Sequence, residues 1–298
     1  MGVAAPGAAT APVALRPQRA SEGLSARMWR RFVRNRLALI SLWLLVAITL
    51  AVAVWPLFLG SPEAIDTPNA LKDPTPQHLL GTDELGRDTL TRLLHAGRIS
   101  LVVGFMAMAI SILVGSLVGG IAGYFGGTAD TVLMRITDAM MSLPAIFLLL
   151  VILVVFGSGL VTVVVVIGVT SWMGAARVVR AEVLRFKNAE FVEAARAMGA
   201  RPRRILAVHV FPNAVPSIIV TASLGVARAI LTESALSYLG LGIQAPTPSL
   251  GNMLSNAQTY LWNAPLQALW PGLLILLIVL ASNFLGDGLR DALDPQMA

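Results

Sequence analysis

Six hydrophobic runs, each close to the length that a helix needs to cross a lipid bilayer, most constrain how this chain can fold. A transmembrane helix requires about 20 predominantly apolar residues. Because lipid offers no hydrogen bonds to the backbone, helices are the expected way to cross it. We therefore predict an all-α polytopic membrane protein with about six transmembrane helices, at residues 37–59, 99–125, 139–156, 160–175, 214–231 and 266–285.

The composition agrees with lipid as the solvent. Hydrophobic residues make up 56% of the 298 residues and charged residues only 13%. A soluble domain of this length has too small a core to bury so much apolar surface. The chain has no cysteine, and its three histidines, His78, His95 and His209, lie far apart. We therefore expect neither disulfides nor a clustered metal site.

Basic residues are concentrated in two segments that flank hydrophobic runs. Residues 1–36 contain seven arginines against one glutamate, and residues 176–212 contain eight Lys or Arg against three Glu. This is the positive-inside pattern of cytoplasmic segments, and it explains the net charge of +6 without a nucleic-acid partner. Six spans then place both termini in the cytoplasm together with 126–138 and 176–212. The loops 60–98, 157–159 and 240–265 lie outside.

The predicted organisation has five parts. Residues 1–24 are rich in Ala, Pro and Gly and lack periodicity, which indicates a disordered cytoplasmic tail. Residues 25–59 comprise a basic amphipathic segment and the first span; that segment is either an interfacial helix or plain charge beside a span. An extracytoplasmic loop occupies 60–98, the core transmembrane domain 99–290, and a cytoplasmic tail 291–298.

Gly115, Gly119 and Gly123 recur at four-residue spacing within the second span. Small residues at this spacing let two helix backbones approach closely. We favour packing within the bundle, and a seam with a second subunit is the alternative.

The segment 190–213 is too patterned for a plain connector. Ala194 and Ala195 give a short helix a face without bulk, and Gly199 can adopt the left-handed conformation that ends a helix. Arg201, Arg203 and Arg204 are expected at the turn that follows, where Pro202 prevents the helix from continuing. Phe211-Pro212-Asn213 is expected to end the segment before the next span. An ordered helix on the cytoplasmic side predicts a docked partner; the alternative is a positive-inside anchor without a docking role.

Four motifs in this order resemble those of binding-protein-dependent ABC importer permeases. EAARAMG at 193–199 with Phe211-Pro212 resembles the EAA loop of that family. HLLGTDELGRD at 78–88 is similar to the segment before the second span in the C-type subunit of the dipeptide/oligopeptide/nickel subfamily. LTESALSYLGLG at 231–242 with PTPSLGNM at 246–253, and NFLGDGLRDALDP at 283–295, complete the resemblance, which covers about residues 25–295.

The resemblance implies a type I ABC importer permease fold with a cytoplasmic coupling helix that sits in a cleft of an ATP-hydrolysing subunit. It implies half of a translocation path for short peptides in a bacterial inner membrane, with nickel chelates, glutathione or haem as alternative solutes. The implied partners are a second permease chain, two ATP-binding subunits and an extracytoplasmic solute-binding protein. The residues expected to couple to the ATPase are Glu190, Glu193, Ala194, Ala195, Met198, Gly199, Ala200 and Arg201.

The segment 78–88 in the predicted external loop, called the signature segment below, has two compatible interpretations. Its acidic side chains can pair with Arg87 or cap the next helix, and the same ordered loop can contact the solute-binding protein. The residues concerned are Gly81, Thr82, Asp83, Gly86, Arg87 and Asp88.

Arg228 and Glu233 lie in or near the fifth span, where ionisable groups usually face a cavity or a partner. Because they are five residues apart on a helix, they point in different directions and are not expected to pair. Glu233 either lines the translocation path or holds the end of the helix by hydrogen bonds. Arg228 stands where the resembled family usually has a small residue. Its charged end either extends (snorkels) to the membrane surface or pairs with an acidic group on a partner subunit.

Two other functional classes were considered. An intramembrane protease needs a nucleophile and a base at matching depth, and Ser158 and the histidines are not so placed. A self-sufficient ion-coupled carrier usually shows repeated halves, which this chain lacks. The chain also has no phosphate-binding loop GxxxxGK[ST], so we expect no enzymatic activity and no cofactor of its own, with ATP and Mg²⁺ on the partner subunits.

Overall fold

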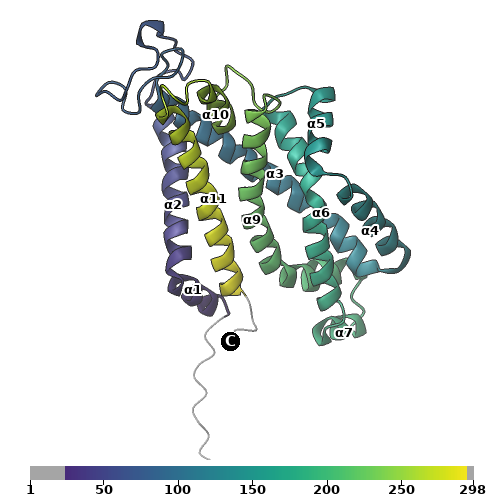
Figure 1. Ribbon diagram of the computed structural model, residues 1–298. Helices are drawn as coiled ribbons and strands as arrows, with labels where there is room; N and C mark the ends of the chain where they lie inside the picture. The colour runs from purple at the N-terminus through teal and green to yellow at the C-terminus, as the bar shows by residue number, and fades with distance from the viewer. Residues whose placement is uncertain (1–23, 294–298) are drawn as a thin grey trace, which may run out of the picture.

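The computed structural model describes residues 24–293, and this part of the chain is built from helices without a β-strand (Figure 1). Five helical stretches are long and apolar enough to cross a membrane. A sixth span is formed if the bent pair α4 (Gly127–Met141) and α5 (Ala145–Phe156) is counted as one. The five are Arg36–Leu57, Thr89–Phe125, Leu160–Phe186, Pro202–Tyr238 and Leu266–Leu293.

The N-terminal segment forms two helices separated by one residue. Helix α1 (Leu24–Arg34) is followed by Asn35, whose side chain caps α2 (Arg36–Val54) by accepting a hydrogen bond from the Ala38 N–H. A short 3₁₀ turn, η1 (Trp55–Leu57), extends α2. Phe32 on α1 is buried against Ala38 and α11. The predicted tail at 1–24 lies outside the described residues except for Leu24, which begins α1.

Helix α3 (Thr89–Phe125) and helix α6 (Leu160–Phe186) form the centre of the bundle. A Cβ atom on Gly115 would lie 2.7 Å from that of Ala175, and one on Gly123 would lie 2.9 Å from the Arg180 carbonyl. The glycines therefore permit close packing of α3 on α6, and the interpretation as packing within the bundle is confirmed. By contrast, only 17% of the most apolar window of α2 is buried, so α2 lies at the periphery.

The third span, predicted at 139–156, is broken near its start. Helix α4 ends at Met141, α5 begins at Ala145, and their axes differ by 85°. Pro144 explains the break, because proline disfavours helical conformation in the residue before it and has no N–H to donate. Most of α4 also occupies the segment 126–138, which was predicted to be a loop.

Helix α7 (Glu190–Ala197) connects α6 to a long helical stretch that begins at Pro202. This stretch comprises α8 (Pro202–Arg204), the π-helical segment η3 (Ile205–Val210) and α9 (Phe211–Tyr238). Helix α7 does not continue through Pro202, as expected, but the expectation that Arg203 and Arg204 lie in a turn is wrong, because Pro202 starts a new helix and proline is well tolerated at the first helical position. Phe211 likewise does not end the segment, since the helix continues through it.

The opposite end of the bundle carries the loop 58–88, which includes a 3₁₀ turn, η2 (Thr67–Asn69), and helix α10 (Leu250–Gln258) (Figure 1). Helix α3 begins at Thr89, so the last part of the predicted loop 60–98 is helical. Helix α10 likewise interrupts the predicted loop 240–265, and its N-terminus has a capping box formed by Ser249 and Asn252.

Helix α11 (Leu266–Leu293) packs against α2 and α9 and completes the bundle. It continues through the start of the predicted tail at 291–298, and only residues 294–298 lie outside the described part of the chain. Helix α9 also continues past the predicted span 214–231 to Tyr238. The length of the apolar runs thus underestimates the length of these helices. Their polar ends remain helical, because the backbone groups there still pair within the helix.

Candidate functional site

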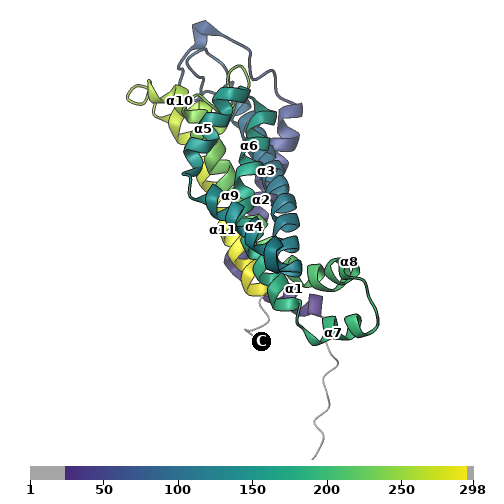
Figure 2. The same ribbon diagram turned by 90° about the vertical axis from the view of Figure 1, so that its right-hand side faces the viewer.

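Helix α7 is attached to the bundle through one narrow apolar face. Val192 and Ala195 are buried and pack in a cluster with Val183, Ile205 and Val210 from the neighbouring helices. Their spacing of three residues places them on the same side of the helix. The remaining residues of α7 project from the bundle at the end where α6 and the stretch from Pro202 meet (Figure 2).

The end of α7 is fixed by a hydrogen-bonded turn at Gly199. Gly199 has a φ of +80°, which is the left-handed conformation that favours glycine. The Ala200 N–H donates to the Ala195 carbonyl at 3.1 Å, and the Gly199 N–H donates to the Arg196 carbonyl at 3.0 Å. This pair of bonds is a Schellman motif, so the chain reverses sharply and returns to the bundle at Pro202.

The predicted coupling residues divide into anchoring and exposed groups. Ala195 anchors the helix and Ala200 is partly buried, whereas Met198 is 81% exposed. The other exposed members are Glu190, Glu193, Ala194, Gly199 and Arg201. The outward face of α7 therefore combines two carboxylates in the first turn, a flat alanine surface and a prominent methionine, which suits contact with another protein better than contact with lipid.

At the opposite end, Asp83 is the centre of a buried charge network. One carboxylate oxygen accepts hydrogen bonds from the backbone N–H groups of Leu85 and Arg87, each at 2.9 Å. The other oxygen accepts from the Arg87 Nε at 2.7 Å and from the Arg92 Nη1. Two guanidinium groups thus share one carboxylate in a site with little solvent, and Glu84 adds a second carboxylate 2.8 Å from Arg87.

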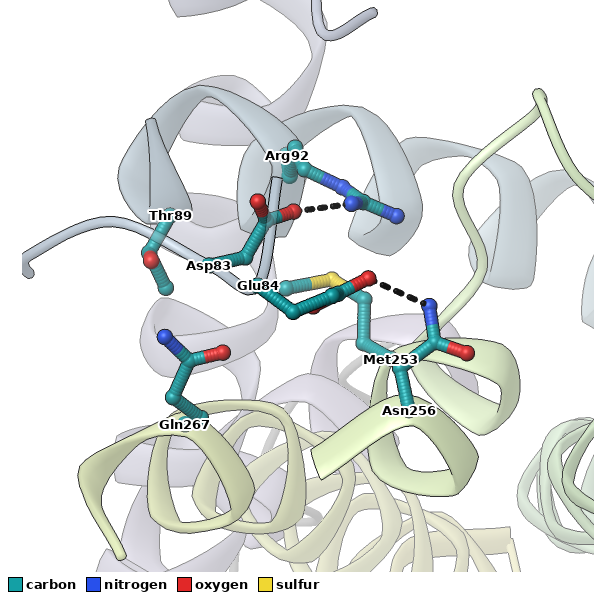
Figure 3. A pocket seen from close by; sticks show the side chains of 7 residues that line it. All are labelled: Asp83, Glu84, Thr89, Arg92, Met253, Asn256 and Gln267. Carbon is teal, nitrogen blue, oxygen red and sulfur yellow. Dashed lines mark hydrogen bonds and ion pairs between the residues drawn. The ribbon is translucent and has the colours of Figure 1, made fainter. Parts of the chain in front are cut away.

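This network joins three parts of the chain (Figure 3). The Asn256 side chain on α10 donates to Glu84 at 3.2 Å, and the Gln267 side chain on α11 donates to the Thr82 carbonyl. The signature segment therefore connects the start of α3 to α10 and α11. Its charged groups act on one another, and their arrangement rigidifies this end of the bundle.

The remaining signature residues shape the loop around this network. Gly81 and Gly86 both have positive φ, as expected for turns, and a Cβ on Gly86 would collide with the Asp66 carbonyl. Asp88 caps α3 by accepting from the Thr91 N–H at 2.8 Å, and it also contacts His78 at 3.0 Å. Asp88 thus caps the next helix, as the structural interpretation of the segment 78–88 predicted.

Glu233 is fully buried and surrounded by serine hydroxyls. Its carboxylate accepts hydrogen bonds from Ser237 at 2.7 Å and from Ser100 on α3 at 2.8 Å. Ser237 in turn accepts from the Ile243 N–H at 3.0 Å. The carboxylate therefore joins the end of α9 to α3 and to the turn before α10.

Arg228 occupies a different environment from Glu233. Its side chain is exposed and lines a pocket of about 680 Å³ between α6, α9 and the α4–α5 bend. Thr221, Leu224 and Gly225 line the same pocket from one face of α9. Arg228 and Glu233 are thus separate, as their spacing predicts.

Sequence reasoning missed several polar residues that join helices. Arg180 on α6 forms a bidentate pair with Asp130 on α4 at 2.5 and 2.6 Å, and Ser217 on α9 donates to Glu182 on α6 at 2.7 Å. These partners are far apart in sequence, so no local pattern reveals them. Arg92 gave a visible signal, as a charge at the start of an apolar run, but was not connected to Asp83.

Within residues 24–293 no group of three or more His, Asp or Glu side chains could hold a metal ion. The described residues form a helical bundle of membrane length, with a lateral cavity and a short helix beyond the spans, an arrangement that suits a multi-pass transport permease. The chain belongs to the family of binding-protein-dependent transport system inner membrane components, whose model matches residues 111–298. The model for the N-terminal transmembrane domain of oligopeptide transport permease C matches residues 23–74.

Curated relatives cover nearly the whole chain. A dipeptide transport system permease of Alkalihalophilus pseudofirmus is 40% identical over 90% of this chain and 89% of its own length. A putative peptide permease of Brucella suis is 43% identical over 93% of each chain. A glutathione transport system permease of Pectobacterium atrosepticum is 40% identical over 90% of each. The resembled family is thereby confirmed, and it is neither a protease family nor one of self-sufficient carriers.

The fold also matches a solved transporter. The inward-facing MetNI methionine ABC transporter contains a chain that superposes with a TM-score of 0.54 at 22% identity. The match covers 68% of this chain and 96% of that one. The predicted type I permease fold is therefore confirmed, and the protein is a multi-pass inner membrane protein.

Proposed function

We propose that this chain is the C-type permease subunit of an ATP-driven importer and forms half of a translocation path for short peptides. The observation that best supports this proposal is the geometry of α7. Two buried residues hold the helix on the bundle while its carboxylates, alanine face and Met198 remain available to another protein. The chain provides no phosphate-binding loop, so the energy for transport comes from ATP and Mg²⁺ on partner subunits.

The same geometry supports an orientation. The α7 end carries the basic segment 176–212, and positive residues mark the cytoplasmic side. On this basis we propose that both termini and α7 lie in the cytoplasm and that the loop 58–88 and α10 lie outside. Trp262 in the loop after α10 is 93% exposed, and an aromatic residue so displayed suits a contact with a solute-binding protein.

The proposed solute class follows the relatives. Those described above carry names for dipeptide, peptide and glutathione permeases, all of which refer to peptides or a tripeptide-like solute. We therefore place short peptides ahead of nickel chelates and haem. The proposed complex contains a second homologous permease, two ATP-binding subunits and an extracytoplasmic binding protein.

The test of α7 is co-purification of the tagged chain from membranes, followed by an ATPase assay. We expect the wild type to bring down a second permease and an ATP-hydrolysing subunit. Glu193→Lys should lose the ATPase subunit, because it reverses a charge in the middle of the exposed face. Glu63→Lys is the matched control, since Glu63 is equally exposed but lies in the loop at the other end of the bundle.

Two results would contradict the proposal for α7. One is recovery of the wild-type chain alone from membranes that contain the neighbouring subunits. The other is an unchanged amount of bound ATPase and unchanged turnover in Glu193→Lys. Uptake of a radiolabelled tripeptide into proteoliposomes, with the binding protein and ATP present, tests the solute class separately.

A further inference from the structure

The pocket lined by Arg228 is large enough to hold a small solute. Its volume of about 680 Å³ falls within the usual range for ligand sites. One wall is the face of α9 that contains Thr221, Leu224 and Gly225, and another is α6 around Ser171. The break between α4 and α5 supplies Leu143 and Pro144 to the third wall, so the bend of the third span shapes this side of the cavity.

Arg228 lies at membrane depth on this wall. It is ten residues before Tyr238, the last residue of α9, which corresponds to about 15 Å along the helix. With the end of α9 taken as the edge of a hydrocarbon core of about 30 Å, this is half of its thickness. A charge at this depth is costly in lipid and requires water or a partner. Because the Arg228 side chain is exposed to the cavity, the cavity has to be hydrated or occupied by a polar group.

The cavity has an excess of positive charge. Arg290, near the end of α11, lines the same pocket, and no Asp or Glu side chain of residues 24–293 does. Within the described residues neither guanidinium forms an ion pair. Glu233, the nearest acidic residue on α9, is turned away and satisfied by Ser100 and Ser237. An anion entering this cavity therefore meets two cations and no carboxylate.

The rest of the lining is mainly apolar and deformable, with hydroxyls only at Thr170, Ser171 and Thr221 among the described residues. Four methionines take part, Met108, Met140, Met141 and Met173, from three different helices. Methionine side chains are flexible and polarizable, and they adapt to partners of different shape. A lining of this kind accepts side chains of varied size while selecting little among them.

We propose that this cavity contains a carboxylate subsite for solutes in transit, with Arg228 at mid-membrane and Arg290 nearer the α7 end. The planar guanidinium donates two parallel hydrogen bonds to a carboxylate, which identifies a feature common to all peptides with a free C-terminus. The methionines contact the variable apolar side chains. The identification of the solute as a peptide rests on the proposed function, whereas the anion preference of the cavity does not.

The absence of cysteine from the chain allows a direct measurement of the charge in the cavity. Ser171→Cys places a near-isosteric thiol on the α6 wall of the intact complex. Its modification by the anionic 2-sulfonatoethyl methanethiosulfonate is compared with that by the cationic 2-(trimethylammonium)ethyl methanethiosulfonate. The readout is the mass of this chain, so cysteines in other subunits do not interfere.

We expect Arg228→Gln to lower the anionic-to-cationic rate ratio by roughly threefold or more, since each probe senses the lost charge in the opposite sense. Arg228→Lys should preserve the ratio. Arg98→Gln, which removes an exposed arginine of α3 outside the cavity, is the matched control and should leave it unchanged. An unchanged ratio in Arg228→Gln, or a thiol that neither reagent reaches, would overturn the proposal.

A transport measurement completes the test. Uptake of trialanine by the wild-type complex establishes the proposed function, and its absence would contradict that function without altering the labelling result. If the wild type transports, Arg228→Gln should reduce trialanine uptake several-fold and Arg228→Lys less so. Loss of the second permease from the purified Arg228→Gln complex would instead show that Arg228 forms an ion pair with an acidic group across the subunit interface. The proposal of a carboxylate subsite would then be wrong.

Discussion

Ser100 on α3 donates a hydrogen bond of 2.8 Å to the carboxylate of Glu233 on α9, and so joins two spans that are 133 residues apart in sequence. Ser237, one turn after Glu233, donates to the other carboxylate oxygen and accepts from Ile243. A buried carboxylate is tolerated only when its oxygens are satisfied, and here hydroxyls from two helices satisfy it. Glu233 is thus placed to fix the end of α9. Arg228, and not Glu233, lines the cavity.

Removal of the Ser237 hydroxyl should destabilise this end of the bundle. Ser237→Ala takes one donor from the buried carboxylate and leaves the Ile243 N–H unpaired, and each unsatisfied group costs about 1–3 kcal/mol. We expect a lower Tm for the purified protein in detergent. Ser142→Ala is the control, because that exposed hydroxyl contacts only the Ala139 carbonyl of its own helix. Equal Tm values for the two variants would contradict the structural importance of the cluster.

Asp83→Asn should be strongly destabilising. It removes the charge that two buried arginines share, and breaking a buried ion pair from one side costs about 3–5 kcal/mol. We expect a low yield of folded protein and rapid proteolysis of the loop 58–88.

Asp88→Asn provides the comparison for that prediction. Asparagine is a good N-cap, so α3 should keep its first turn, and the pair lost with His78 is partly exposed. This variant should remain close to wild type in yield and protease resistance. If both variants behave alike, the buried charge network is not what orders this end of the protein.

Gly119→Ala should weaken the contact between α3 and α6. A Cβ at this position would collide with the Ala176 carbonyl, which is backbone and cannot rotate away. We expect a fall in Tm from the strain, which is typically about 1–3 kcal/mol for overpacking. Gly174→Ala on α6 is the opposite case, because nothing lies within 4 Å of its Cβ. That change should be neutral or should raise the Tm slightly.

Much of the fold follows from local patterns. Apolar length predicted the spans, and the left-handed conformation that ends α7 was predicted at Gly199. The bend at Pro144 was missed although proline is a visible signal, because the apolar run continues on both sides of it. Hydropathy reports that a segment can lie in lipid but not that its axis is straight.

The long-range polar contacts could not be predicted in the same way. The Asp130–Arg180 pair and the Ser100–Glu233 bond depend on which helices are neighbours. A charged residue in a span signals only that it needs a partner or a cavity, and the structure separates these outcomes for Glu233 and Arg228. The anchoring face of α7 was not predicted either: Ala195 was expected on the bulk-free docking face, and the structure buries it with Val192 against the bundle.

Substitution of Gly199 tests whether α7 depends on its turn or on its side chains. Gly199 has a φ of +80° with open space around it, so only backbone conformation limits the residue at this position. Asparagine tolerates the left-handed region, whereas a β-branched residue does not. Gly199→Asn should therefore retain coupling, and Gly199→Val should lose it, because the Ala200–Ala195 bond fails and α7 can no longer return to Pro202. The measurement is stimulation of ATPase activity by the binding protein, with the amount of co-purified ATPase subunit as the second readout. Equal activity in the two variants would mean that the coupling face does not require this turn, and that Val192 and Ala195 alone position the helix.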